Sequence, residues 1–292
     1  MPYHFLHEQE PDAGGTLQRV NTIFLTGKEC AFKCLMCDLW KNTLDEATPK
    51  GAVLRQIDHA LAQLPEGDII KLYNGSNFFD PKAIPHEDYT GIIERVNTYK
   101  RVIVENHPKL CGKACIEFSK QMSGRLEIAM GLETIHPGVL PLLNKQMTTE
   151  DFAAAALFLR NNQVDVRAFV LLNPPYLTGR DENIRWAFDT VKFAFNNGAR
   201  CCSIIPTRPG NGIMELLQHD HKYAAPALDM LEEVFERALN LKQGLVFADT
   251  WDIRFLSHCD QCFEDRKNRL DAMNLDQQIH PKINCNCQLV YA

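Results

Sequence analysis

Short apolar runs alternate with longer amphipathic segments along most of the chain. Six runs are rich in Ile, Val, Leu and Phe without regular polar alternation, as in strands that are covered on both faces of a parallel sheet. The predicted strands are 20–26, 68–74, 101–106, 125–132, 164–172 and 199–206. Between and after them, apolar positions recur every three or four residues, which indicates helices. The predicted helices are 50–63, 87–98, 110–122, 149–161, 181–197 and 224–241.

This alternation predicts an α/β fold of parallel strands joined by right-handed crossovers. Eight β-α units would close a full barrel, so about six predict a partial (β/α)6 barrel of the TIM type. An open doubly wound sheet is the alternative, but no glycine-rich phosphate turn follows the first strand. We expect an N-terminal extension at 1–18, a barrel core at 19–245 and a small cysteine-rich, metal-binding extension at 246–292.

Composition narrows the possible partners and the location. The chain has 292 residues, 45% of them hydrophobic, which is enough for a sizeable core. Its formal net charge of −6 gives it no general attraction for nucleic acid. No apolar run approaches the roughly 20 residues of a membrane span, and the first residues do not read as a secretory signal. Eleven cysteines then indicate a reducing, cytoplasmic location with metal or catalytic roles for the thiols.

A triplet of cysteines, Cys30, Cys34 and Cys37, follows the first predicted strand with the spacing C-x3-C-x2-C. Three thiolates can hold three irons of a [4Fe–4S] cluster and leave the fourth iron without a protein ligand. A zinc site would need a second cysteine or histidine pair nearby, and a redox pair would need only two cysteines. The spacing therefore favours a cluster with one open iron at the mouth of the barrel. It disfavours a zinc site, a redox pair and buried structural cysteines.

A second cysteine set lies near the C-terminus. Cys259, Cys262, Cys285 and Cys287 form two close pairs, which predicts a second metal site. Four thiolates suit either structural zinc or an auxiliary [4Fe–4S] cluster, and the sequence leaves both possibilities open, together with unliganded thiols. The remaining four cysteines are predicted to be structural, because buried cysteine needs no function: Cys111, Cys115, Cys201 and Cys202.

The cysteine triplet after a strand resembles the signature of the radical S-adenosylmethionine (SAM) enzymes. This resemblance implies that the free iron chelates the amino and carboxylate groups of SAM. One electron from the cluster would then split SAM into a 5′-deoxyadenosyl radical, so the cofactor carries the difficult chemistry. The implied cofactors are a [4Fe–4S] cluster and SAM, and the implied electron donor is ferredoxin or flavodoxin. The chain would be an enzyme, with its class as lyase or transferase left open.

Polar residues follow three of the predicted strands where this resemblance places SAM. Asn74, Gly75 and Ser76 follow the second strand and would bind the amino group of SAM; taken alone, they read as a simple turn. Glu105 and Glu133 follow the third and fourth strands and would bind the ribose hydroxyls or the ammonium group. The alternative for both glutamates is a surface or capping acid.

Four further positions complete the predicted site. Arg167 interrupts an apolar strand, and a buried guanidinium needs an anionic partner, either the SAM carboxylate or Glu133. The resemblance places Met36 against the adenine and assigns Leu171 to the same cofactor site. Arg208 would serve the substrate or SAM. No residue is assigned as a catalytic base.

Four stretches resemble one branch of the radical SAM enzymes, which contains the elongator catalytic subunit and the radical-SAM subunit of archaeosine synthase: 72–80, 104–108, 131–134 and 168–175. In archaeosine synthesis a partner enzyme joins lysine to a deazaguanine base in tRNA. The resemblance implies that this chain abstracts a hydrogen from the lysine part and breaks a C–N bond. Two alternatives remain: sulfur insertion or another small-molecule reaction with an auxiliary cluster, and a non-enzymatic, metal-stapled electron carrier.

Overall fold

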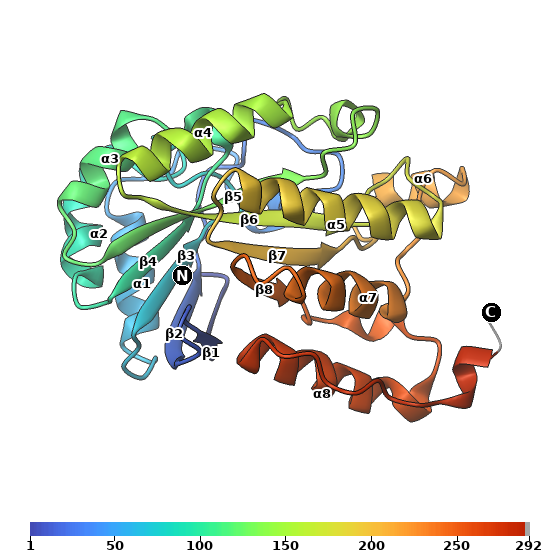
Figure 1. Cartoon of the computed structure of the whole chain (residues 1–292). Helices are drawn as coiled ribbons and strands as arrows, with labels where there is room; N and C mark the ends of the chain where they lie inside the picture. Colours follow the sequence, from blue (N-terminus) through green and yellow to red (C-terminus); the bar gives the residue numbers. More distant parts are fainter. Residues whose placement is uncertain (290–292) are drawn as a thin grey trace.

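The computed structural model describes residues 1–289, which form one curved sheet with helices on its outer face (Figure 1). The eight strands of this described part lie in sequence order, from β1 at one edge to β8 at the other. β1 (His4–Pro11) runs antiparallel to β2 (Leu17–Phe24), and every later neighbour is parallel. The later strands are β3 (Ile69–Tyr73), β4 (Arg101–Glu105), β5 (Arg125–Glu133), β6 (Asp165–Leu172), β7 (Cys201–Pro206) and β8 (Leu245–Ala248).

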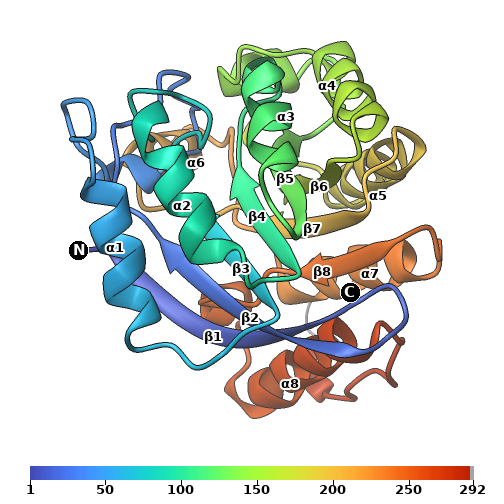
Figure 2. The same ribbon diagram turned by 90° about the vertical axis from the view of Figure 1, so that its left-hand side faces the viewer.

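Six helices connect successive parallel strands and cover the outside of the sheet (Figure 2). They are α1 (Ala52–Leu61), α2 (Tyr89–Val96), α3 (Lys113–Lys120), α4 (Thr149–Asn161), α5 (Arg180–Asn196) and α7 (Leu228–Leu239). A short α6 (Ile213–His219) precedes α7, and α8 (Asp260–Asp276) follows β8. Short 3-10 turns lie at Leu39–Asn42, His86–Asp88, Pro108–Leu110, Leu140–Leu143, Ile253–Leu256 and Asn286–Leu289. The predicted partial barrel of alternating strands and helices is confirmed.

The structure adds four elements that the sequence pattern did not predict: β1, β8, α6 and α8. The segment 1–18, expected as an extension, contributes β1, which pairs with β2 from His4 to Pro11. The segment 246–292, expected as a second extension, contributes most of β8 and all of α8. Both segments are therefore built onto the barrel sheet.

The main apolar core lies between the sheet and its outer helices. Alternate strand residues such as Leu72, Val104 and Val170 point outward into this core. The intervening residues point to the inside of the half-barrel, where smaller apolar clusters form, one around Ile103 and Ala129 and another of Cys201, Leu245 and Phe247. The rest of the interior is therefore available to polar and charged side chains.

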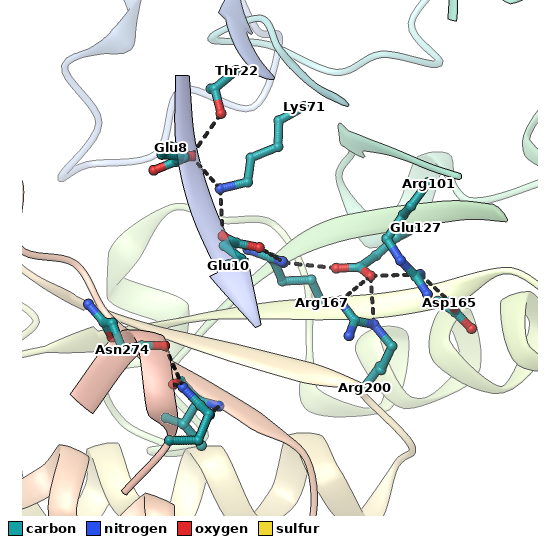
Figure 3. Close-up of polar contacts among 12 residues, drawn as sticks. Glu8, Glu10, Thr22, Lys71, Arg101, Glu127, Asp165, Arg167, Arg200 and Asn274 are labelled. Carbon is teal, nitrogen blue, oxygen red and sulfur yellow. Dashed lines mark hydrogen bonds and ion pairs between the residues drawn. The ribbon is translucent and has the colours of Figure 1, made fainter. Parts of the chain in front are cut away.

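A network of buried ion pairs fills the interior near the amino ends of the parallel strands (Figure 3). Arg167 on β6 binds Glu10 on β1 at 2.8 Å and Glu127 on β5 at 2.8 Å. Lys71 on β3 binds the same Glu10 at 2.6 Å. Burial alone would raise the pKa of Glu10, but Arg167 and Lys71 outweigh it and hold that pKa well below its usual range. The network thus links β1 to β3, β5 and β6 across the barrel.

Helix α8 lies against both edge strands, β1 and β8. Its Asn274 side chain donates to the carbonyl of Ala248 and accepts from the Ala248 N–H, both at 2.9 Å. Gln277 makes the same pair of bonds with the backbone of Val246, at 2.8 and 2.9 Å. The two amides thereby satisfy edge groups that a further strand would otherwise bind. Among residues 1–289, no helix has the length and apolar character needed to span a membrane.

Candidate functional site

The loop that carries the cysteine triplet, residues 30–37, follows β2 at the carboxyl end of the sheet. The Leu35 N–H donates to the carbonyl of Leu143 at 2.9 Å, which ties the loop to the segment after β5. The Asn211 side chain donates to the carbonyls of Leu35 and Cys37 at 2.8 and 3.2 Å, which ties it to the segment after β7. The segments that follow β5 and β7 therefore both hold the cysteine loop in place.

The three thiols of the triplet are free and partly exposed. Burial raises the pKa of the Cys34 thiol to about 12, and the positive charge of Lys145 opposes this effect. The Asn77 amide donates to the Cys30 sulfur at 3.2 Å. Three thiols on one loop are the ligands that a [4Fe–4S] cluster with one open iron needs.

A buried ion pair lies behind the loop. Lys145 Nζ binds Glu133 Oε1 at 2.6 Å, and both side chains are buried. Gly131 makes room for the pair, because a Cβ at that position would collide with both the Glu133 carboxylate and the Lys145 ammonium. Glu133 therefore already has a cationic partner from the protein. Lys145, which sequence reasoning missed, brings a positive charge toward Cys34 and Cys30.

His107 is a second residue that sequence reasoning missed, and it packs against the cysteine loop. Its ring stacks on Phe32 with centroids 3.6 Å apart and an interplanar angle of 7°. Its Nδ1 accepts from the Lys109 N–H, so its Nε2 is the atom that donates to the Lys145 carbonyl at 2.9 Å. Burial lowers the pKa of His107 to about 4, which keeps the ring neutral. The sequence offered one signal for His107, its position just after β4 at the carboxyl end of the sheet.

Asn74 lies at the end of β3 and is fully buried. Neither its Nδ2 nor its Oδ1 has a hydrogen-bond partner among the described residues, and the Ser76 hydroxyl has none either. Leaving a buried polar group unpaired costs about 1–3 kcal/mol, so bound water or a ligand is needed to satisfy these atoms. Gly75 between them has φ of +58°, a conformation that glycine adopts without strain.

Glu105 lies next to this segment at the end of β4. Its carboxylate accepts from the Asn74 N–H at 3.1 Å. Burial raises the pKa of Glu105 to about 7, against the opposing effect of the Asn74 and Gly75 N–H groups. A cationic ligand group beside it would favour the carboxylate form.

The raised pKa of Glu105 predicts a pH-dependent stability. An acid whose pKa rises on folding destabilises the native state once it is ionised, so stability falls as the pH rises from about 4.5 to about 7. We expect Glu105→Gln to remove this loss, about 3 kcal/mol, so that the variant gains in melting temperature over the wild type between pH 5 and pH 8. The exposed Glu117→Gln is the matched control. Parallel pH profiles of variant and wild type would contradict the prediction.

An apolar wall faces the loop on its other side. Leu171 on β6 is buried with Val139, Leu143 and Leu177, and Met36 from the cysteine loop packs against them. The structure thus brings Met36 and Leu171 into one apolar cluster. Such a wall suits a flat apolar ring.

Arg167 lies away from the loop, in the ion network. Its Nε, Nη1 and Nη2 donate to Glu127 and Glu10, so neither predicted partner, the SAM carboxylate nor Glu133, is the one that it binds. The prediction missed these partners because β1, which supplies Glu10, was not foreseen. Arg208 binds Asp249 at 2.9 Å.

The C-terminal cysteines lie together as predicted. Cys259 and Cys285 have their sulfurs 3.8 Å apart, and Cys262 and Cys287 have theirs 3.6 Å apart. All four sulfurs lie within 4.8 Å of one another, so the set could hold a metal ion. The other four cysteines are free, and all of them but Cys111 are buried.

Solved structures share this architecture. Coproporphyrinogen III oxidase of Escherichia coli, described as a radical SAM enzyme, matches 80% of this chain with a TM-score of 0.51 and 13% identity. The chain has the radical SAM fold. SuiB of Streptococcus suis matches 78% of it with a TM-score of 0.54 and 13% identity. The chain spans about half of each structure, 52% and 48%.

Sequence relatives of this radical SAM-fold chain are distant. An uncharacterized protein of Methanocaldococcus jannaschii is 22% identical over 92% of this chain and 80% of its own length. Archaeosine synthase subunit beta of Methanosarcina acetivorans is 24% identical over 70% of this chain and 61% of its own length. No protein-family model matches the chain.

Proposed function

We propose that this chain is a radical SAM enzyme, with a [4Fe–4S] cluster bound by Cys30, Cys34 and Cys37 and SAM bound beside it. The observation that carries the proposal is the fully buried Asn74 amide without a partner at the same end of the sheet as the cysteine loop. When bound, the cluster supplies one electron that splits SAM into methionine and a 5′-deoxyadenosyl radical, which abstracts a hydrogen from the substrate.

The residues at the mouth fit these two groups. The Asn74 amide, the Ser76 hydroxyl and the Glu105 carboxylate offer oxygen acceptors for an ammonium group, with Gly75 allowing close approach. Met36 and Leu171 would flank the adenine. Three thiolates add negative charge to the loop, and the buried Lys145 nearby offsets part of it. Glu133 would then influence the cluster through its ion pair with Lys145 and would not contact SAM itself.

The proposed reaction is C–N bond cleavage during modification of a tRNA nucleoside, as in archaeosine synthesis. The distant relative named archaeosine synthase subunit beta supports this choice. That name denotes a subunit, which supports a partner enzyme that presents the modified tRNA. The formal charge of −6 is consistent with a partner that does most of the tRNA binding. Ferredoxin or flavodoxin would supply the electron.

The test is SAM cleavage by the full chain. The protein is reconstituted without air with iron and sulfide, reduced with dithionite and incubated with SAM. We expect 5′-deoxyadenosine, with more formed when a partner-modified tRNA is added. Protein that binds four irons at the triplet but never releases 5′-deoxyadenosine would overturn the proposal.

Asn74→Ala tests the SAM pocket. Because the amide has no protein partner, its removal should leave the melting temperature of SAM-free protein unchanged or slightly higher. We expect the Kd for SAM to rise about tenfold, the effect of one lost hydrogen-bonding group. Isothermal calorimetry on reconstituted protein measures the affinity. Asn162→Ala, which removes an exposed amide at the end of α4, is the matched control; equal SAM affinity in the two variants would contradict the assignment.

A further inference from the structure

The geometry of the four C-terminal cysteines decides between the two metal sites that their sequence leaves open. A zinc ion with Zn–S bonds of about 2.3 Å in a tetrahedron places its sulfurs about 3.8 Å apart. The sulfurs here are 3.8 Å apart for Cys259 and Cys285 and 3.6 Å apart for Cys262 and Cys287. All pairs lie within 4.8 Å, so each thiol has the other three as neighbours.

A cubane cluster would need a wider arrangement. Its four thiolates bind four different irons on the outside of the cube, so their sulfurs stand farther apart than the ligands of one ion. We propose that Cys259, Cys262, Cys285 and Cys287 bind a single zinc ion. Four thiolates favour zinc over hard cations, and four protein ligands leave no open position for catalysis. The inference does not depend on the proposed reaction at the barrel mouth.

The surroundings balance the charge of such a site. Zinc with four thiolates carries two net negative charges. Arg266, one turn along α8 from Cys262, interacts with the Cys262 sulfur while its Nη2 binds Glu232 at 2.6 Å. Cys259 caps the amino end of α8, where the free backbone N–H groups of the helix carry partial positive charge. The buried arginine and the helix end both place positive charge near the sulfurs.

The zinc would fix a segment that has no core of its own. After α8 the chain turns and runs back along this helix to Cys285 (Figure 1). None of the residues 278–287 is buried. Apart from the thiols, this segment is held mainly by hydrogen bonds from the Arg269 guanidinium on α8 to the carbonyls of His280 and Pro281, at 2.6 to 3.1 Å. Small segments without a core commonly depend on a structural metal.

The metal content of a triplet-deficient protein is the decisive measurement. With Cys30, Cys34 and Cys37 all changed to alanine, the full chain keeps only the C-terminal site. We expect one zinc per chain, no iron, and the intense visible bands of a tetrahedral cobalt(II) thiolate after exchange with cobalt. Iron with sulfide in this variant would assign an auxiliary cluster. Free thiols at all four C-terminal cysteines, or two disulfides among them, without metal would exclude a metal site. Either result overturns the inference, whatever happens at the triplet.

Removing two ligands tests the structural role. In the triplet-deficient protein, the double change Cys285→Ser and Cys287→Ser should abolish zinc binding. Trypsin should then cleave the bond after Lys282 about tenfold faster. Cys111→Ala, a cysteine outside the site, is the control and should keep both the zinc and the protection. Retention of one zinc by the double variant would refute the ligand assignment. Unchanged cleavage after loss of the zinc would refute the stapling role.

Discussion

The Cys34→Ala variant is expected to form no measurable 5′-deoxyadenosine, a loss of at least about a thousandfold. Three thiolates bind three irons of the cluster and leave the fourth open. With only two thiolates, a second iron would lack its protein ligand. Cys34 sits in a partly exposed loop, so its removal should leave the fold intact. The readouts are iron content, the visible absorption of the cluster and product formation after anaerobic reconstitution.

The control for this prediction is Cys111→Ala. Cys111 is also a partly exposed free cysteine, but it lies after β4 and outside the loop. It should keep about four irons at the triplet and full activity. A Cys34→Ala protein with wild-type iron content and product formation would remove the basis of the proposed function.

Glu127→Gln is expected to lower the free energy of unfolding by about 3–5 kcal/mol. Glu127 is fully buried and binds three guanidinium groups: Arg167 at 2.8 Å, Arg101 at 2.9 Å and Arg200 at 2.6 Å. A neutral amide would leave these cations without their shared counter-charge in a low-dielectric interior. Chemical denaturation followed by circular dichroism measures the change in the unfolding midpoint.

Two further variants separate the buried network from ordinary surface charge. Asp58→Asn breaks an exposed pair with Arg95 and should cost no more than about 1 kcal/mol. Adding Arg200→Met to Glu127→Gln should restore part of the loss, because it removes a cation whose ion pair among the described residues is with Glu127. Equal destabilisation by Asp58→Asn and Glu127→Gln would show that the interior network contributes little.

Most of the parallel strands could be predicted because they form short runs of mainly apolar residues between amphipathic helices. β1 escaped prediction because Glu8 and Glu10 give it a polar pattern, although both bind Lys71 inside the barrel. α8 escaped because Arg266 and Arg269 interrupt the buried stripe that Phe263, Leu270 and Met273 form on this helix. Residues that are buried as ion pairs cannot be distinguished from surface charge in a sequence.

The candidate site shows the same division. The order of strand and loop placed the cysteine triplet, Asn74 and Glu105 at the carboxyl end of the sheet, where the structure has them. The partners of Glu133 and Arg167 could not be foreseen, because Lys145 comes from a loop beyond β5 and Glu10 from β1. Pairing across a barrel depends on which strand lies opposite, and local sequence does not contain that information.

The amides of Asn274 and Gln277 restrict how this molecule can assemble. A second polypeptide that lengthened the sheet beyond β8 would have to displace their four hydrogen bonds to Val246 and Ala248. Chain-to-chain pairing through that strand, the common route to aggregates and swapped dimers, is therefore disfavoured from the start. Any partner of this chain would therefore bind it without lengthening the sheet at β8.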